Sequence, residues 1–128
     1  MRKTVKDLVA NARQQVRDMS AAEVAEALEG GTAVVVDLRE PDEVRRDGAI
    51  AGAVLAPRGM LEFWADPACP YHRPEFDPAT RTILYCASGG RSALAARSLK
   101  EIGYTDVAHL GGGLTAWEED GRPVTSQP

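Results

Sequence analysis

The stretch Tyr85-Cys86-Ala87-Ser88-Gly89-Gly90-Arg91-Ser92 carries the strongest structural signal in this chain of 128 residues. The apolar run at 82–85 predicts a strand over 81–85, and the segment 91–102 after the glycines has the spacing of a helix. The short loop between them directs backbone N–H groups and the positive end of the helix dipole toward its own centre. Both features favour a thiolate over a thiol, so we expect Cys86 to be a nucleophile.

Strands and helices alternate along the rest of the chain. A capping box at Ser20 and Glu23 predicts a helix that ends at Gly30-Gly31, and the β-branched run at 33–36 suits a strand buried on both faces. Further segments predict helices over 41–46, 60–64 and 114–120, a turn and short strand within 48–57, and a strand at 107–110. This alternation predicts an α/β fold, in which helices cover both faces of a mostly parallel central sheet.

Ligands of such folds bind beyond the carboxyl ends of the strands. The segment Asp37-Leu38-Arg39-Glu40 follows one predicted strand, and the Cys86 loop follows another. The sequence therefore places the candidate site at the edge of the sheet where these two segments meet.

The first 19 residues differ from the remainder in charge. They hold five basic and two acidic side chains, whereas the whole chain has a net charge of −4. Apolar residues from Val5 to Met19 recur at helical spacing, which predicts an amphipathic helix over about 4–18. We interpret its basic residues as a solvated face in preference to a targeting segment. The expected parts are a helical extension at 1–19, a domain at 20–122 and a frayed tail at 123–128.

Composition argues against several classes of function. The chain has 44% hydrophobic and 27% charged residues, as ordinary soluble proteins do. Its acidic balance gives no reason to expect nucleic-acid binding, and no apolar run approaches the length of a membrane span. No apolar signal segment opens the chain, and two cysteines are too few for a disulfide framework. We therefore expect a reactive thiol in a reducing compartment, the cytoplasm.

Three other residues with reactive side chains need an interpretation. Cys69 and His72 lie in a proline-rich segment at 66–80 that predicts a long irregular loop. Two ligands do not make a metal site, so no metal is expected. Cys69 could be a resolving thiol for Cys86 or an idle loop cysteine, and the sequence leaves both open. His109 lies in a buried strand pattern and is expected to be a core histidine.

Four short motifs, in their order and spacing, resemble those of single-domain rhodaneses, a family of sulfurtransferases. The resemblance spans residues 20–120 and rests on the Asp37-Leu38-Arg39-Glu40 turn, the stretch 48–53, the loop from Cys86 to Arg91, and the closing stretch 103–117. It implies the three-layer rhodanese fold. Two departures are visible: Ala49 stands where many rhodaneses have histidine, and the loop at 66–80 is longer than in the smallest members.

The resemblance also implies the chemistry of the loop. Sulfur-transferring members resemble C-x4-R, whereas related phosphatases and arsenate reductases have C-x5-R loops sized for a tetrahedral oxyanion. Here Cys86 and Arg91 bracket four residues, which are Ala87, Ser88, Gly89 and Gly90. By resemblance, the Cys86 thiolate attacks a donor such as thiosulfate, and loop amides from Ala87 to Ser92 hold the resulting persulfide. Cyanide, a small thiol or a protein acceptor then takes the sulfur, and no cofactor is expected.

The remaining candidate residues support this loop. By resemblance, Arg91 forms a salt bridge with Asp37, which ties the loop to the end of the preceding strand. Arg39 follows Asp37 in the same turn, and we expect it to support the loop or to line the pocket. Arg58 could face the pocket and bind an anionic donor, or be a plain surface arginine.

Two functions compete with sulfur transfer. The first is a non-enzymatic or redox-sensing rhodanese module that binds a partner protein. The second is a phosphatase or arsenate reductase, which the short loop disfavours.

Overall fold

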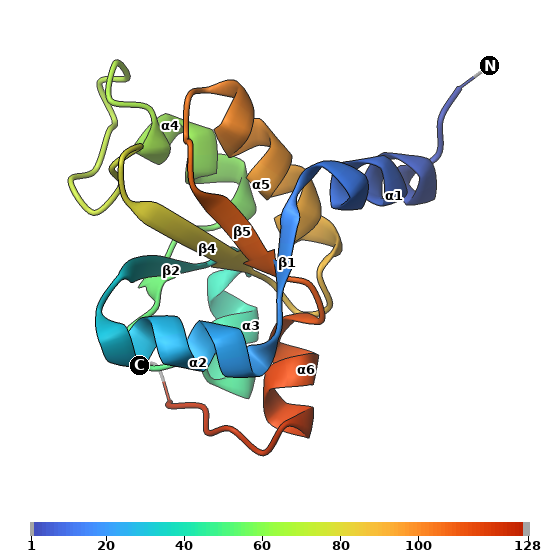
Figure 1. Ribbon diagram of the computed structural model, residues 1–128, viewed down its shortest axis with the longest axis vertical. Helices are drawn as coiled ribbons and strands as arrows, with labels where there is room; N and C mark the ends of the chain where they lie inside the picture. Colours follow the sequence, from blue (N-terminus) through green and yellow to red (C-terminus); the bar gives the residue numbers. More distant parts are fainter. Residues whose placement is uncertain (1, 127–128) are drawn as a thin grey trace.

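The computed structural model describes residues 2–126. Five parallel strands form one sheet in the order β1-β5-β4-β2-β3, with helices on both faces (Figure 1). This architecture confirms the predicted α/β fold. The strands are β1 (Arg17–Met19), β2 (Ala33–Asp37), β3 (Val54–Leu55), β4 (Arg81–Tyr85) and β5 (Val107–Leu110). The helices are α1 (Val5–Gln15), α2 (Ala21–Gly30), α3 (Pro41–Asp47), α4 (Leu61–Ala65), α5 (Gly90–Glu101) and α6 (Gly113–Glu119), and a 3-10 turn, η1 (Arg58–Met60), precedes α4.

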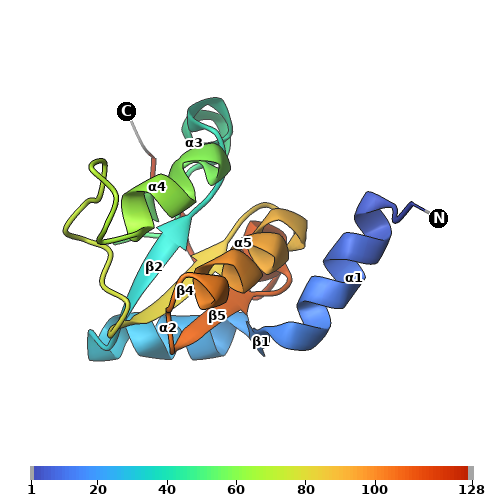
Figure 2. The ribbon, with the colours of Figure 1, turned by 90° about the horizontal axis from the view of Figure 1, so that it is seen from above.

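Alternate side chains of the strands enter two apolar cores, one on each face of the sheet. Val36 of β2 packs in the core that α4 and α5 cover, whereas its neighbour Val35 packs in the core that α2 and α6 cover. Figure 2 shows α5 and α2 on opposite sides of the strands. Each fully buried aliphatic side chain contributes about 1.5–3 kcal/mol to stability. The two cores therefore hold the strand ends, and the loops that follow them, in fixed positions.

The local signals in the sequence correspond closely to the observed elements. Ser20 caps α2 as predicted: its Oγ accepts from the Glu23 N–H at 3.1 Å, and the Glu23 carboxylate accepts from the Ser20 N–H at 3.0 Å. Strand β4 has the predicted bounds, and residues 66–80 contain no helix or strand. These elements are specified by neighbouring residues, so their bounds can be predicted without knowledge of the tertiary structure.

The N-terminal segment departs from the prediction. Helix α1 ends at Gln15, and the chain then turns into the edge strand β1, where Arg17 pairs with Ala108 of β5. The helix predicted over 4–18 is thus wrong for its last residues. Val16 and Met19 are buried in the two cores, and their spacing in the sequence fits a helix as well as this short strand. The division of the chain at residues 19 and 122 stays a prediction.

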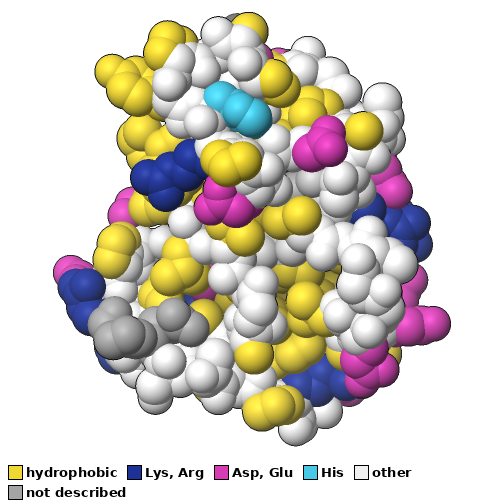
Figure 3. Space-filling view, turned by 90° about the vertical axis from the view of Figure 1, so that its left-hand side faces the viewer, with side chains coloured by type: hydrophobic (Ala, Val, Ile, Leu, Met, Phe, Trp, Pro, Cys, Tyr) yellow, Lys and Arg dark blue, Asp and Glu magenta, His cyan; other side chains and the backbone are white. Residues whose placement is uncertain are grey.

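The face of the molecule opposite α1 has a mixed surface (Figure 3). Hydrophobic side chains are exposed across much of it, and acidic and basic side chains are scattered between them. Neither sign of charge dominates this face, so it offers no extended patch for a polyanion. No helix within residues 2–126 is long and apolar enough to cross a membrane.

Candidate functional site

Cys86 lies where central strand β4 ends and the loop to α5 begins. Its side chain is 1% exposed, and the N–H of Gly89 donates to its Sγ at 3.2 Å. Gly89 has a φ of +106°, and a Cβ at this position would overlap the carbonyl oxygen of Gly111. The loop can therefore turn back on the sulfur only because residue 89 has no side chain.

The first turn of α6 holds the outside of this loop. The N–H of Leu114 donates to the Cys86 carbonyl at 2.9 Å, and the N–H of Thr115 donates to the Ala87 carbonyl at 3.2 Å. Gly113 has a φ of +64°, and a Cβ there would overlap the Ala87 carbonyl oxygen. Gly113, the first residue of α6, thus allows the helix to pack closely against the cysteine loop, a role that its sequence context did not reveal.

Helix α1 also borders the loop, which the sequence did not predict. The guanidinium of Arg13 donates to the Gly111 carbonyl at 3.2 Å and to the Ser88 carbonyl at 3.4 Å. Val9 lies against Gly90, and the views in Figures 1 and 2 place α1 beside α5. Arg13 lies 75 positions from Ser88 and 98 positions from Gly111, so no local pattern in the sequence could indicate these contacts.

Arg91 does not pair with Asp37, so that prediction is wrong. Its guanidinium donates to both carboxylate oxygens of Glu43, on the first turn of α3, at 2.8 and 3.0 Å. These hydrogen bonds lower the pKa of Glu43 to about 2. The pKa of Arg91 is raised, first by Glu43 and to a smaller extent by the charge of Cys86. The loop is therefore tied to α3, and its arginine lies within electrostatic reach of the sulfur.

Asp37 instead anchors a buried network at the end of β2. Its carboxylate accepts from Arg39 Nε at 3.0 Å, from Arg39 Nη2 at 2.7 Å and from the Tyr85 hydroxyl at 2.6 Å. Burial, followed by the charge of Asp37, raises the pKa of Tyr85. Both carboxylate oxygens of Asp37 accept hydrogen bonds from these two neighbours, and Arg39 already balances its charge. Asp37 therefore does not need Arg91 as a partner. This network connects the ends of β2 and β4, and the roles of Asp37 and Arg39 in the site stay predictions.

Ser92 and His109 extend the environment of Cys86 inward. The Cys86 thiol donates to Ser92 Oγ over 3.7 Å, and Ser92 Oγ lies 2.8 Å from His109 Nδ1. His109 is 1% exposed, as expected for a core histidine, and burial lowers its pKa. No local pattern in the sequence connects it with the cysteine, because Cys86 follows β4 whereas His109 lies on β5.

A model of the rhodanese-like domain family matches residues 20–120 of this sequence. The chain belongs to this family. The chloroplastic thiosulfate sulfurtransferase 16 of Arabidopsis thaliana is 33% identical over 93 residues, which are 70% of this chain and 77% of that protein. The uncharacterized protein slr1261 of Synechocystis is 36% identical over 91 residues, and the match covers 71% of this chain but only 46% of that protein. Relatives of this rhodanese-like domain thus include proteins named as sulfurtransferases.

A solved structure from Rhodopseudomonas palustris resembles almost the whole chain. It has a TM-score of 0.91 and 38% sequence identity, and the match covers 98% of this chain and 96% of that one. That protein is described as one of unknown function and as a possible tyrosine phosphatase. Because the match extends beyond residues 20–120, it includes segments that flank the rhodanese-like domain model here.

The other predicted positions of this rhodanese-like domain lie apart from the loop contacts. Arg58 forms an ion pair with Glu62 on α4, at 2.8 and 3.1 Å, so its charge is already matched. Cys69 and Cys86 are both free thiols. Within residues 2–126, no three His, Cys, Asp or Glu side chains gather as a metal site requires. The roles of Arg58 and Cys69 in the site stay predictions.

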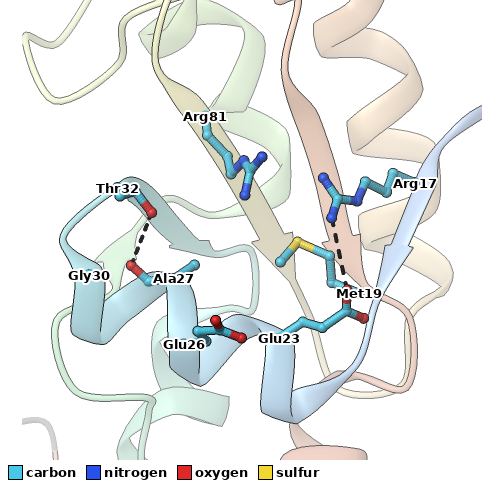
Figure 4. Close-up of a pocket in the computed structure, with 8 residues that line it drawn as sticks. All are labelled: Arg17, Met19, Glu23, Glu26, Ala27, Gly30, Thr32 and Arg81. Atoms are coloured by element: carbon cyan, nitrogen blue, oxygen red, sulfur yellow. Dashed lines mark hydrogen bonds and ion pairs between the residues drawn. The ribbon is translucent and has the colours of Figure 1, made fainter.

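A hollow of about 370 Å³ lies elsewhere on the domain, between α2 and the strands β1 and β4 (Figure 4). Figure 4 shows Arg17 and Arg81 on its strand side and Glu23 on its helix side. Arg17 Nη2 lies 3.9 Å from Glu23 Oε2, and Arg81 Nε lies 3.0 Å from Asp106 Oδ2. Each of these two cations thus has an acidic partner. Cys86 does not line this hollow, and the loop after β4 remains the candidate site.

Proposed function

We propose that the protein is a sulfurtransferase that carries a sulfane sulfur as a persulfide on Cys86. The observation that supports this most directly is the buried thiol at the end of β4, whose Sγ accepts the N–H of Gly89 at 3.2 Å. A backbone N–H aimed at the cysteine sulfur stabilises negative charge there, as on the thiolate that begins the reaction. The family relationship, which includes named sulfurtransferases, supports the same assignment.

The first half of the reaction loads the sulfur. The Cys86 thiolate attacks the outer sulfur of a donor such as thiosulfate, a new S–S bond forms, and sulfite leaves with the electron pair of the broken S–S bond. The amides of the loop from Ala87 to Ser92 are the groups proposed to hold the terminal sulfur. Gly89 and Gly90 carry no Cβ, so the backbone can approach that sulfur closely.

The second half returns the enzyme to its starting state. A nucleophile such as cyanide, a small thiol or a protein thiol attacks the outer sulfur, and Cys86 leaves as a thiolate. Since the sulfur travels as a covalent persulfide, the cycle needs no metal or organic cofactor. The proposal places the protein in a reducing compartment such as the cytoplasm, where a free thiol persists.

Phosphatase activity, which the description of the Rhodopseudomonas relative raises, fits these residues less well. A phosphate cradle needs an arginine whose guanidinium presents two parallel N–H groups to the anion. In this chain Nη1 and Nη2 of Arg91 both donate to Glu43. The loop also has four residues between Cys86 and Arg91, which favours a smaller cradle.

Intact mass measurement tests the proposal. We expect a gain of about 32 Da after thiosulfate treatment and loss of that mass after cyanide, with thiocyanate as the product. Cys86→Ser should gain nothing, while Cys69→Ser, the matched control for the second cysteine, should behave as the parent protein does. Loading without turnover would favour a sulfur-binding regulatory module. Hydrolysis of an aryl phosphate without any loading would overturn the proposal in favour of a phosphatase.

A further inference from the structure

Three buried side chains from three elements form a continuous row that ends at the sulfur. Cys86 follows β4, Ser92 lies on the first turn of α5 and His109 lies on β5. Their exposed fractions are 1%, 0% and 1%. The S–O distance of 3.7 Å and the O–N distance of 2.8 Å connect the thiol to the imidazole through one hydroxyl.

The hydroxyl of Ser92 has one proton and can serve two patterns of hydrogen bonds. With neutral His109 and no proton on Nδ1, Ser92 donates to Nδ1 and accepts from the Cys86 thiol. With a proton on Nδ1, His109 donates to Ser92, whose own proton is free to face the sulfur or the Gly89 carbonyl at 3.2 Å. The two patterns differ only in the positions of two protons.

We propose that Cys86, Ser92 and His109 form a proton relay in which His109 takes the thiol proton through Ser92. In this step the S–H bond of Cys86 breaks as its proton binds Ser92 Oγ, and the original Ser92 proton moves to His109 Nδ1. The products are a thiolate, a neutral serine and an imidazolium, and no electrons leave the three groups. His109 is then a positioning residue for the proton, because it acts through Ser92. The inference rests on the proposed function, since sulfur transfer needs this thiolate.

A buried site needs such an arrangement because the sulfur is closed off from water. A lone thiolate in the core would be costly, whereas a thiolate that forms together with an imidazolium leaves the local charge unchanged. The relay also works in reverse, since the imidazolium can return the proton when an acceptor has removed the sulfur and no donor is bound.

The charged groups that face His109 act in opposite directions. Burial lowers the pKa of His109, Asp18 of β1 raises it, and Arg13 of α1 lowers it. Asp18 is the register neighbour of His109 across the β1–β5 pair, and its Oδ1 accepts the Gly111 N–H at 2.9 Å. In the proposed relay the Cys86 thiolate supplies a further negative charge, and Arg91 lies within electrostatic reach of that thiolate. The imidazolium is therefore stabilised by Asp18 and by the thiolate that forms with it, and opposed by burial and Arg13.

The test is the pH profile of Cys86 alkylation by iodoacetamide, in a Cys69→Ser background that leaves a single thiol. We expect His109→Gln and Ser92→Ala each to move the midpoint of the profile up by about one pH unit, which lowers the rate near neutral pH about tenfold. The double variant should show no further shift, because both changes interrupt one relay. A structural defect would instead change the rate at all pH values. A folded His109→Gln or Ser92→Ala variant with the parent profile would overturn the proposal.

Two further measurements decide the question if a core variant does not fold. Asp18→Asn keeps an oxygen for the Gly111 N–H and removes only the charge, so we expect a smaller upward shift, about 0.3–0.5 pH unit. In NMR spectra, alkylation of Cys86 should move the titration of His109 to lower pH while His72, the other histidine of the chain, serves as an internal reference. An unchanged His109 titration would refute the relay.

Alkylation uses no sulfur donor, so the relay and the proposed function can fail separately. A shifted pH profile without persulfide loading would support the relay and remove the sulfurtransferase proposal. If a His109→Gln variant kept the parent pH profile of alkylation and was still loaded with persulfide, the relay would be refuted and the sulfurtransferase proposal supported.

Discussion

Two arginine–carboxylate pairs at the carboxyl edge of the sheet have similar geometry and opposite surroundings. Arg39 and Asp37 meet at 3.0 and 2.7 Å with side chains 1% and 0% exposed, whereas Arg91 and Glu43 meet at 2.8 and 3.0 Å with side chains 38% and 24% exposed. A buried charge that loses its partner remains in the core, but a half-exposed charge is solvated again. The comparison therefore assigns the first pair to the stability of the fold and the second to the shape of the site.

The largest expected effect is at Asp37. Asp37→Asn removes the charge that matches buried Arg39 and should lower the free energy of unfolding by about 3–5 kcal/mol, measured by urea denaturation. Arg39 would keep its hydrogen bond to the Gly48 carbonyl, at 2.7 Å, but that acceptor is neutral. The double variant Asp37→Asn/Arg39→Met should regain part of the loss, because it leaves no buried charge. If the free energy of unfolding of Asp37→Asn stayed within about 1 kcal/mol of the parent value, burial would not account for a difference between the two pairs.

A smaller effect is expected at Tyr85, the third member of the buried network. Its hydroxyl donates to Asp37 at 2.6 Å and accepts the Ile50 N–H at 3.1 Å. Tyr85→Phe should therefore cost about 1–2 kcal/mol in urea denaturation. Tyr104→Phe is the matched control, since its buried hydroxyl donates to a neutral carbonyl, that of Ala65, at 2.8 Å. An equal cost for both variants would mean that the charge of Asp37 adds nothing to this hydrogen bond.

The half-exposed pair should respond in activity more than in stability. Glu43→Gln keeps an acceptor for the Glu40 N–H that caps α3 but releases the charge of Arg91. We expect a loss of at most about 1 kcal/mol in the free energy of unfolding, and about a tenfold loss in thiocyanate formation from a looser loop. Asp106→Asn breaks another partly exposed pair, with Arg81, and should leave the transfer rate unchanged. If Glu43→Gln kept the activity of the parent protein, the contact between Arg91 and Glu43 would not be needed to shape the loop.

The smallest expected effect is the pH dependence of this pair. The pKa of Glu43 is lowered from 4.5 to about 2 by Arg91, so the pair contributes stability above the unfolded value and loses it as the pH falls through the folded one. The difference in the free energy of unfolding between the parent and Glu43→Gln should be constant above about pH 4.5 and vanish near pH 2. Because the pair is partly exposed, we expect this difference to stay below about 1 kcal/mol. Urea denaturation at stepped pH values measures it, and a difference that grows on acidification would contradict the assignment.

Local signals in the sequence were sufficient for much of the fold. Strand β4, the cap of α2 at Ser20 and the glycine loop after Cys86 each depend on residues within a few positions of one another, and all were predictable. Strand β1 was not, because three residues are too few for a periodic pattern and its pairing partner begins at residue 107.

The candidate site likewise has parts that local sequence predicts and parts that depend on contacts between distant segments. Cys86 and its loop were identified from one contiguous stretch, whereas the partner of Arg91 was assigned wrongly. Asp37 ends β2 and Glu43 lies on the helix that follows it, and only the tertiary structure shows that Arg39 and Tyr85 already bind Asp37. The contacts of Arg13 and His109 with the loop environment join distant segments, so no spacing in the sequence could indicate them.

The pairing of β1 with β5 has a consequence for biosynthesis. The N-terminal strand has no neighbour in the sheet until residues 107–110 have left the ribosome, and the carbonyl of Cys86 has no clamp until residue 114 follows. Parallel pairings between distant segments form late in folding. An incomplete nascent chain thus contains the thiol and its loop but lacks the contacts of β5 and α6 that hold this loop in place. We therefore expect the full reactivity of Cys86 to appear only when synthesis of the domain is nearly finished.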